Sequence, residues 1–152
     1  MSRMRWAGVT ALALLGACER APQLTGGSAT AGDVAVTDGV AWGLASSRST
    51  TVGFRVTSVA ADTLVGITSA DGTAMLHDTV NDRMVHLERL PMAAGATLVL
   101  GAGGPHIMLT GTTHGYTRGD SVRLVLTFAR NGTLPITVPL FNFSEASGLL
   151  GR

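Results

Sequence analysis

The sequence contains no lysine and only one cysteine, Cys18. Its basic residues are all arginines, and they are scattered rather than gathered in the basic stripe that binds nucleic acid. A single cysteine cannot form a disulfide within the chain. No nucleophile elbow, phosphate-binding loop or HExxH helix occurs either. These absences exclude a disulfide-stapled fold and favour a protein that is neither an enzyme nor a nucleic-acid binder.

Long apolar runs are also missing, and the clearest short one lies near the N-terminus. Residues 6–17 carry no charge, follow two arginines and are too few to span a bilayer as a helix. They lead through small residues to Cys18, as a bacterial lipobox does. We expect residues 1–17 to be a lipoprotein signal peptide and Cys18 to be lipidated, which would anchor the protein to a membrane facing the periplasm. An ordinary secretory signal cut nearby is the alternative.

The mature chain would have 135 residues and a formal charge of −1, because Arg3 and Arg5 leave with the signal. That length suits a single domain with a modest core. Residues 18–32 are rich in Ala, Gly, Ser and Thr, which predicts a lipidated flexible tether. We expect a folded domain over residues 33–143 and a C-terminal tail over 144–152.

Short β-branched runs broken by Gly, Asp and Pro fill the expected domain. Their alternation of apolar and polar residues predicts strands rather than helices. Pro135 and Pro139 mark the last strand as an edge. The expected fold is all-β, an antiparallel Greek-key β-sandwich with no helix. The predicted strands are 34–37, 52–57, 63–69, 74–78, 83–89, 96–100, 106–111, 122–128 and 134–140.

Three of these strands carry histidine and methionine on the face opposite to their aliphatic residues. Solvent-facing positions of a sheet ordinarily take Thr, Ser, Lys, Arg or Glu. Each residue alone has an ordinary interpretation, as a core methionine or a solvated histidine. The pattern is informative because it recurs with the aliphatic residues in phase. The positions are Met75, His77, Met84, His86, His106 and Met108.

Thioether and imidazole together predict a site for a soft or borderline metal ion. Cu(I) is the natural choice, with Cu(II) as the alternative oxidation state, because thioether is a poor ligand for zinc, calcium or magnesium. With no thiolate available, a blue-copper electron-transfer centre is excluded. Exposed thioether and imidazole suit capture and handover of copper better than hydrolysis. The nearby acids Asp78, Asp82 and Glu88 are interpreted as solvated charges.

One spacing and several segments match a known family. Met84 is separated by twenty-one residues from the pair His106-Ile107-Met108. The other matching segments are Leu64-Val65-Gly66-Ile67-Thr68-Ser69, Met75-Leu76-His77-Asp78, Gly103-Gly104-Pro105 and Gly119-Asp120-Ser121-Val122. Over most of residues 33–140 the chain resembles the periplasmic copper chaperone family called PCu(A)C. The resemblance implies a cupredoxin-like sandwich that binds Cu(I) and helps to supply the copper of cytochrome c oxidase.

The resemblance implies a copper shell of His77, Met84, His106 and Met108. Only six residues separate His77 from Met84, fewer than is usual in the family, so His86 and Met75 on the same face are possible substitutes. His114 is expected to take no part. Two other functions remain open, a copper buffer that confers resistance and a sandwich that binds a protein partner through a methionine-rich patch.

Overall fold

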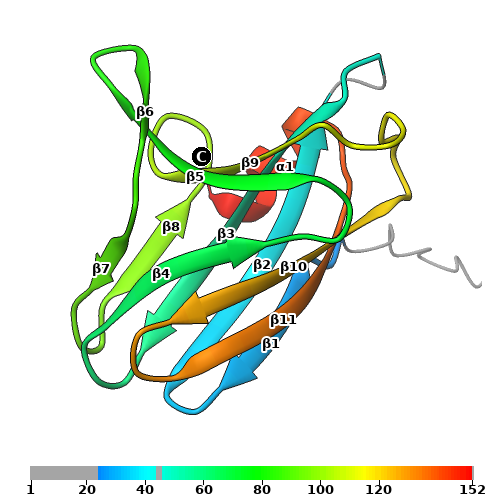
Figure 1. Cartoon of the computed structure of the whole chain (residues 1–152). Helices are drawn as coiled ribbons and strands as arrows, with labels where there is room; N and C mark the ends of the chain where they lie inside the picture. The colour runs from blue at the N-terminus through cyan, green and yellow to red at the C-terminus, as the bar shows by residue number, and fades with distance from the viewer. Residues whose placement is uncertain (1–23, 44–45, 152) are drawn as a thin grey trace, which may run out of the picture.

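Two antiparallel sheets form most of the protein (Figure 1). The computed structural model describes residues 24–43 and 46–151. The strands are β1 (Gly27–Ala31), β2 (Val34–Gly43), β3 (Ser49–Ser58), β4 (Asp62–Thr68), β5 (Thr73–Val80), β6 (Arg83–His86), β7 (Leu90–Met92), β8 (Thr97–Leu100), β9 (His106–Thr110), β10 (Ser121–Phe128) and β11 (Gly132–Pro139). The predicted all-β antiparallel sandwich is confirmed.

The larger sheet has the strand order β1-β2-β3-β9-β5-β6, with β8 also paired to β3. The smaller sheet has the order β11-β10-β4-β7. The chain passes between the sheets after β3, β4, β6, β7 and β9, so β3 and β9 become neighbours although they are distant in sequence. Because β11 lies at the end of its sheet, the predicted edge position of Pro135 and Pro139 is confirmed.

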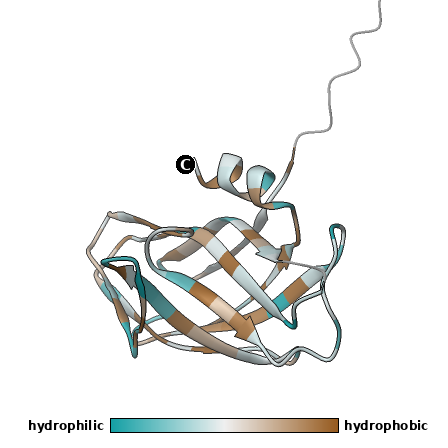
Figure 2. Ribbon diagram, turned by 90° about the horizontal axis from the view of Figure 1, so that it is seen from above, coloured by the Kyte–Doolittle hydropathy of each residue, from teal (hydrophilic) through white to brown (hydrophobic). Residues whose placement is uncertain are grey.

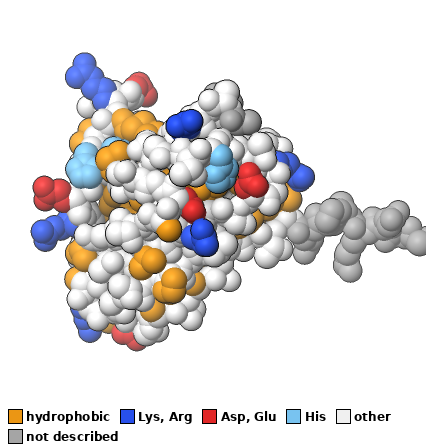
Figure 3. All heavy atoms as spheres, turned by 45° about the vertical axis from the view of Figure 1, so that its right-hand side comes forward, with side chains coloured by type: hydrophobic (Ala, Val, Ile, Leu, Met, Phe, Trp, Pro, Cys, Tyr) orange, Lys and Arg blue, Asp and Glu red, His pale blue; other side chains and the backbone are white. Residues whose placement is uncertain are grey.

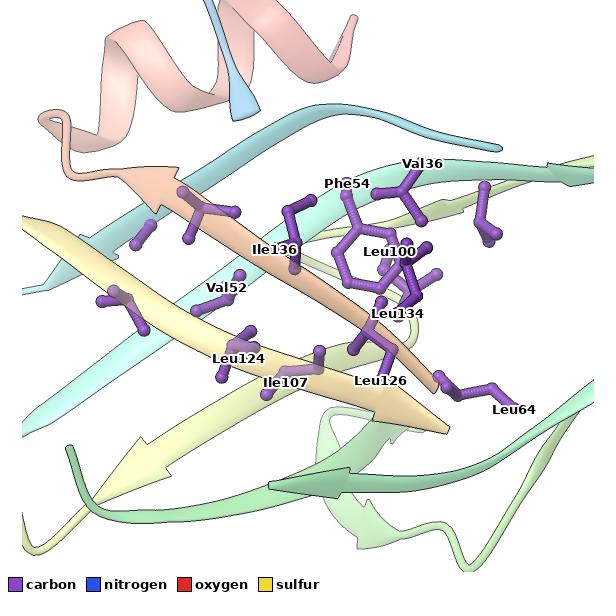
Figure 4. Packing of buried hydrophobic residues seen from close by; sticks show 14 of the residues in the cluster. Val36, Val52, Phe54, Leu64, Leu100, Ile107, Leu124, Leu126, Leu134 and Ile136 are labelled. Atoms are coloured by element: carbon purple, nitrogen blue, oxygen red, sulfur yellow. The ribbon is translucent and has the colours of Figure 1, made fainter. Parts of the chain in front are cut away.

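The core lies between the two sheets and consists of the alternating apolar residues of both. Val52 and Phe54 of β3 face Leu124 of β10 and Ile136 of β11 across the layer (Figure 4). Each of these side chains is at most 4% exposed. Burying a side chain of this size stabilises the fold by about 1.5–3 kcal/mol. The alternation that predicted these strands is therefore the pattern that builds the core.

The sandwich begins earlier than residue 33, and the predicted tether is corrected accordingly. Residues Gly27–Ala31 form β1, which pairs antiparallel with β2. Their small, polar side chains are typical of a linker, but their backbone groups complete the edge of the sheet. Residues 1–17, Cys18 and the first part of the tether lie outside the described residues.

A helix occupies the segment that was predicted to be a tail, which corrects that expectation. Helix α1 (Phe143–Leu150) lies on the outer side of the larger sheet (Figure 2). Asn142 and Glu145 form a capping box at its start, and Gly151 in the left-handed region ends it. Leu150 is buried against the sheet. In the part of the chain that the structure describes, no helix is long and apolar enough to cross a membrane.

The short strand β7 was not predicted. It has three residues, and Pro91 at its centre removes a backbone donor. Pairing with β4 and burial of Met92, which is 2% exposed, hold it in the sheet. Tertiary contacts therefore decide its structure.

We predict that Gly27→Ala destabilises the domain by about 1–3 kcal/mol, the usual range for overpacking. A Cβ at Gly27 would overlap the backbone carbonyl of Thr137 in β11. Chemical denaturation measures the free energy of unfolding. Gly66→Ala is the control, since its Cβ would meet the Thr127 side chain at an ordinary 3.4 Å. Equal losses for both variants would contradict the close approach of β1 to β11.

Candidate metal-binding site

Three histidines lie side by side on neighbouring strands of the larger sheet. Strand β5 pairs with β9 on one side and with β6 on the other, so His77 stands opposite both His106 and His86. The ring centroids of His77 and His86 are 5.7 Å apart, and those of His77 and His106 are 6.1 Å apart. We call these three residues the histidine row.

A two-residue turn sets this alignment. Asn81 and Asp82, between β5 and β6, both have positive φ, of 51° and 59°. Such a turn pairs Val80 with Arg83, and counting back along both strands then pairs His77 with His86. The Asn-Asp pair is the sequence signal from which this neighbour of His77 could have been found.

The histidine row lies on the outer face of the sheet, as the phase of the aliphatic residues predicted for β5 and β9. Leu76 and Ile107, which alternate with the histidines, are 5% and 0% exposed in the core. Exposure rises along the row, from buried His106 through half-buried His77 to exposed His86. The row thus runs from the body of the protein to its surface, and Figure 3 shows histidine side chains at the surface beside hydrophobic ones.

Two methionines form a second row next to the first. Met75 of β5 pairs with Met108 of β9, and each lies two residues from a histidine on the same face. Both are half-buried. The register therefore brings two thioethers beside His77 and His106.

Met84 does not lie beside Met75 and Met108 in the structure. Met84 pairs with Thr79, on the far side of the histidine row from Met75 and Met108. It shares their face, but its side chain is 55% exposed near the hairpin tip. By register, His86 is nearer to His77 than Met84 is.

A backbone carbonyl fixes the ring of His106. Its Nδ1 lies 2.8 Å from the carbonyl oxygen of Gly104. Because a carbonyl only accepts, Nδ1 carries a proton, so the neutral form of the ring has its lone pair on Nε2. Metal-binding histidines are commonly oriented by such a bond.

His77 is held in its neutral form at the centre of the row. Burial, together with the neighbouring imidazoles of His106 and His86, lowers the pKa of His77 below the ordinary value of 6.5. Its Nδ1 is buried and has no hydrogen-bond partner among the described residues. A neutral imidazole can accept a metal ion without first losing a proton.

The spacing of the rings fits imidazoles that share one metal ion. With a metal–nitrogen bond of about 2.0–2.1 Å, the ring centroids of two such ligands lie about 5–6.5 Å apart, depending on the bond angle. The two separations in the row fall in this range. Among the described residues no group of three or more His, Cys, Asp or Glu is placed to hold a metal. A complete shell here therefore needs methionine sulfur.

His114 lies away from the row, in the segment between β9 and β10. Its ring packs against that of Tyr116 at 5.0 Å, and Tyr116 is buried in the core. The Nδ1 of His114 lies 3.2 Å from the hydroxyl of Thr113. These contacts account for His114 without a ligand role.

Comparisons with known proteins agree with the fold. A family model described as "Putative lipoprotein LpqE-like" matches residues 20–140. "Putative lipoprotein Lxx21020" of Leifsonia xyli subsp. xyli is 33% identical over 96% of this chain and 95% of its own length. The structure titled "Copper-bound PCuAC domain from PmoF2" superposes with a TM-score of 0.67 and 17% identity, covering 76% of this chain and 97% of that one.

A second solved structure, of Cu(I)-loaded DR1885 from Deinococcus radiodurans, has a TM-score of 0.54 and 22% identity. It covers 83% of this chain and 82% of that one. At these identities the likeness concerns the fold alone. The resemblance to PCu(A)C domains is therefore confirmed for the fold, while the cupredoxin-like description stays a prediction.

We predict that the apo domain loses stability as the pH falls below about 6.5. The unfolded state then binds a proton at His77 that the folded state resists, so the free energy of unfolding rises with pH across this window. Denaturation at a series of pH values measures the slope. His77→Gln should make the slope smaller. An unaltered slope in His77→Gln would contradict a lowered pKa of His77 in the folded protein.

Proposed function

The chain belongs to the LpqE-like lipoprotein family, and we propose that it is a membrane-anchored protein that captures Cu(I) and passes it on. The observation that carries this proposal is the histidine row with two methionines beside it. Imidazole and thioether without thiolate form a donor set that suits Cu(I). The solved structures of this fold include, by their titles, a copper-bound PCuAC domain and a Cu(I) form of DR1885.

We propose that the copper is bound by two neighbouring imidazoles of the row, His77 with either His86 or His106, and by Met108, with Met75 as a further sulfur donor. The register supports His86 where the sequence spacing favoured Met84, because His86 stands directly beside His77. Met84 lies on the same face of β6, two residues from His86 toward the turn between β5 and β6. Being exposed, it suits a first contact with arriving copper rather than the final shell.

The graded exposure of the row suits transfer rather than permanent storage. Copper entering at exposed His86 can reach half-buried His77 and buried His106 by exchange of single ligands. A partner that offers its own ligands at the His86 end could remove copper by the reverse path. The imidazoles of the row also suit Cu(II), while the adjacent thioethers favour Cu(I).

The resemblance to copper chaperones suggests a copper subunit of cytochrome c oxidase as recipient. A copper buffer that confers resistance would use the same ligands without this partner. A methionine-rich surface for a protein partner is the alternative from another class. Neither the fold nor the histidine row calls for catalysis, and we propose a binding protein rather than an enzyme.

We predict that His86→Asn lowers the affinity for Cu(I) about tenfold or more. Replacing even a residue that only hydrogen-bonds to a metal ligand commonly lowers metal affinity by about tenfold or more. Met108→Leu should also lower it while leaving stability nearly unchanged, because bulk and hydrophobicity are kept. Competition with a chromophoric Cu(I) chelator gives the affinities.

Two matched variants serve as controls for the copper experiment. His114→Asn should not change the affinity, since His114 lies outside the row. Met84→Leu should cost less than His86→Asn. If Met84→Leu were the more damaging of the two, the assignment of His86 to the shell would be wrong. Displacement of Cu(I) by an equal concentration of Zn(II) would refute a soft site altogether.

We predict that Cys18→Ser releases the protein from the membrane fraction. The lipobox-like segment before Cys18 and the match to putative lipoproteins support lipidation at this residue. Fractionation of cells that express either form is the measurement. Membrane association that survives the substitution would contradict a lipid anchor at Cys18.

A further inference from the structure

Helix α1 carries an exposed aromatic side chain on the outside of the sandwich. Phe143 is 57% exposed and is the one aromatic among the large exposed hydrophobic residues of the described chain. Its ring meets that of Trp42 edge-on at 6.2 Å. Trp42 in turn packs against the small cluster of Val40, Ala146 and Leu150 that holds α1 on the sheet. Phe143 is therefore supported by Trp42, which itself packs against the sheet.

The start of the described chain lies beside the same helix. Leu24, which is 37% exposed, lines an open hollow of about 770 Å³ together with Leu149 of α1. We define the α1 face as Leu24, Trp42, Phe143 and Leu149. It combines the aromatic pair of Trp42 and Phe143 with two aliphatic side chains, Leu24 and Leu149, which lie where the N-terminal segment joins the domain.

The distance to the proposed anchor is short. Five residues lie between Cys18 and Leu24, so six residue steps join them, and a fully extended chain spans at most about 3.6 Å per step, or roughly 20 Å here. Because the pairing of β1 with β2 begins at Gly27, at most nine residues, 18–26, join the anchor to the sheet. A lipid on Cys18 would hold the α1 face close to the membrane surface.

The charges beside this face are paired. Glu145 of α1 accepts three hydrogen bonds from the guanidinium of Arg118, the shortest 2.7 Å, and the Asp38 carboxylate lies 3.2 Å from the Arg55 guanidinium. The chain has no lysine, and its mature formal charge is −1. Attraction to anionic lipids is therefore not available, and association would depend on apolar contact.

We propose that the α1 face docks on the lipid surface of the membrane that holds the Cys18 anchor. This proposal rests on the proposed function, since it requires the anchor. Phe143 would insert at the level of the headgroups, where aromatic side chains are favoured. The acyl chains and the inserted face together would fix the orientation of the domain.

Docking at α1 would also orient the copper site. Leu150 of α1 packs over Gly53 of β3, where an added Cβ would come within 2.9 Å of its side chain. Gly53 lies one residue beyond the pair formed by Val52 and Ile107, so it adjoins His106 in the neighbouring strand. The helix and the histidine row thus share the outer face of one sheet, and a domain docked by α1 presents its copper at a fixed angle to the membrane.

Trp42 provides a direct test. The chain has two tryptophans, and Trp6 leaves with the signal, so Trp42 is the only one in the mature protein. The lipidated full-length mature protein is placed in phosphatidylcholine vesicles whose acyl chains are brominated near the headgroup. We expect quenching of Trp42 relative to unbrominated vesicles, and no loss of quenching at high salt.

Matched variants distinguish docking from simple proximity. Phe143→Ser and Leu149→Ser should each reduce the quenching, whereas Phe143→Leu should largely keep it. Val59→Ser is the control, because Val59 is 76% exposed but lies in the turn after β3, away from the α1 face. Retained Cu(I) binding shows that each variant is folded.

Vesicle flotation tests the lipid anchor at Cys18 separately from docking of the α1 face. Protein that floats with the vesicles while Trp42 stays unquenched would overturn docking and leave the anchor intact. Protein that does not float would refute the anchor, and docking with it. Unquenched Trp42 together with crosslinked dimers that require Phe143 would make the α1 face an interface between two copies, which also overturns the proposal.

Discussion

The position of β5 between β9 and β6 is the constraint on which the site depends. One register places Leu76 in the core and aligns His77 with histidines on both neighbouring strands. A slip of one residue would send Leu76 to the surface and His77 into the core, so burial of apolar side chains selects the same register that aligns the three histidines. The stability of the sandwich and the geometry of the site therefore have one physical cause.

Sequence patterns predicted much of the fold and only part of the site. Alternation identified most strands and the outer face that bears the histidines, because a half-buried strand repeats every two residues. It missed β1, β7 and α1: pairing with β2 and β4 holds the two strands, and packing of Ala146 and Leu150 on the sheet holds the helix. Spacing along the chain favoured Met84, whereas the lateral neighbour of His77 depends on the turn at Asn81 and Asp82.

The electrostatics of the site suit a metal that exchanges. His77 stays neutral because burial and two neighbouring imidazoles oppose its protonation, and Gly104 orients His106 so that Nε2 is available. The thioethers add donors without adding charge. In the function we propose, copper would be bound by residues of increasing burial, from exposed His86 to buried His106, and released in the reverse order.

X-ray absorption at the copper edge of the Cu(I)-loaded mature protein tests the central claim most directly. We expect at least two imidazole nitrogens at about 2.0 Å and at least one sulfur at about 2.3 Å, judged from zinc–ligand distances. His86→Asn should reduce the imidazole contribution, and Met84→Leu should leave the sulfur contribution in place. A shell of methionine sulfur without imidazole scattering would contradict a copper site built on the histidine row.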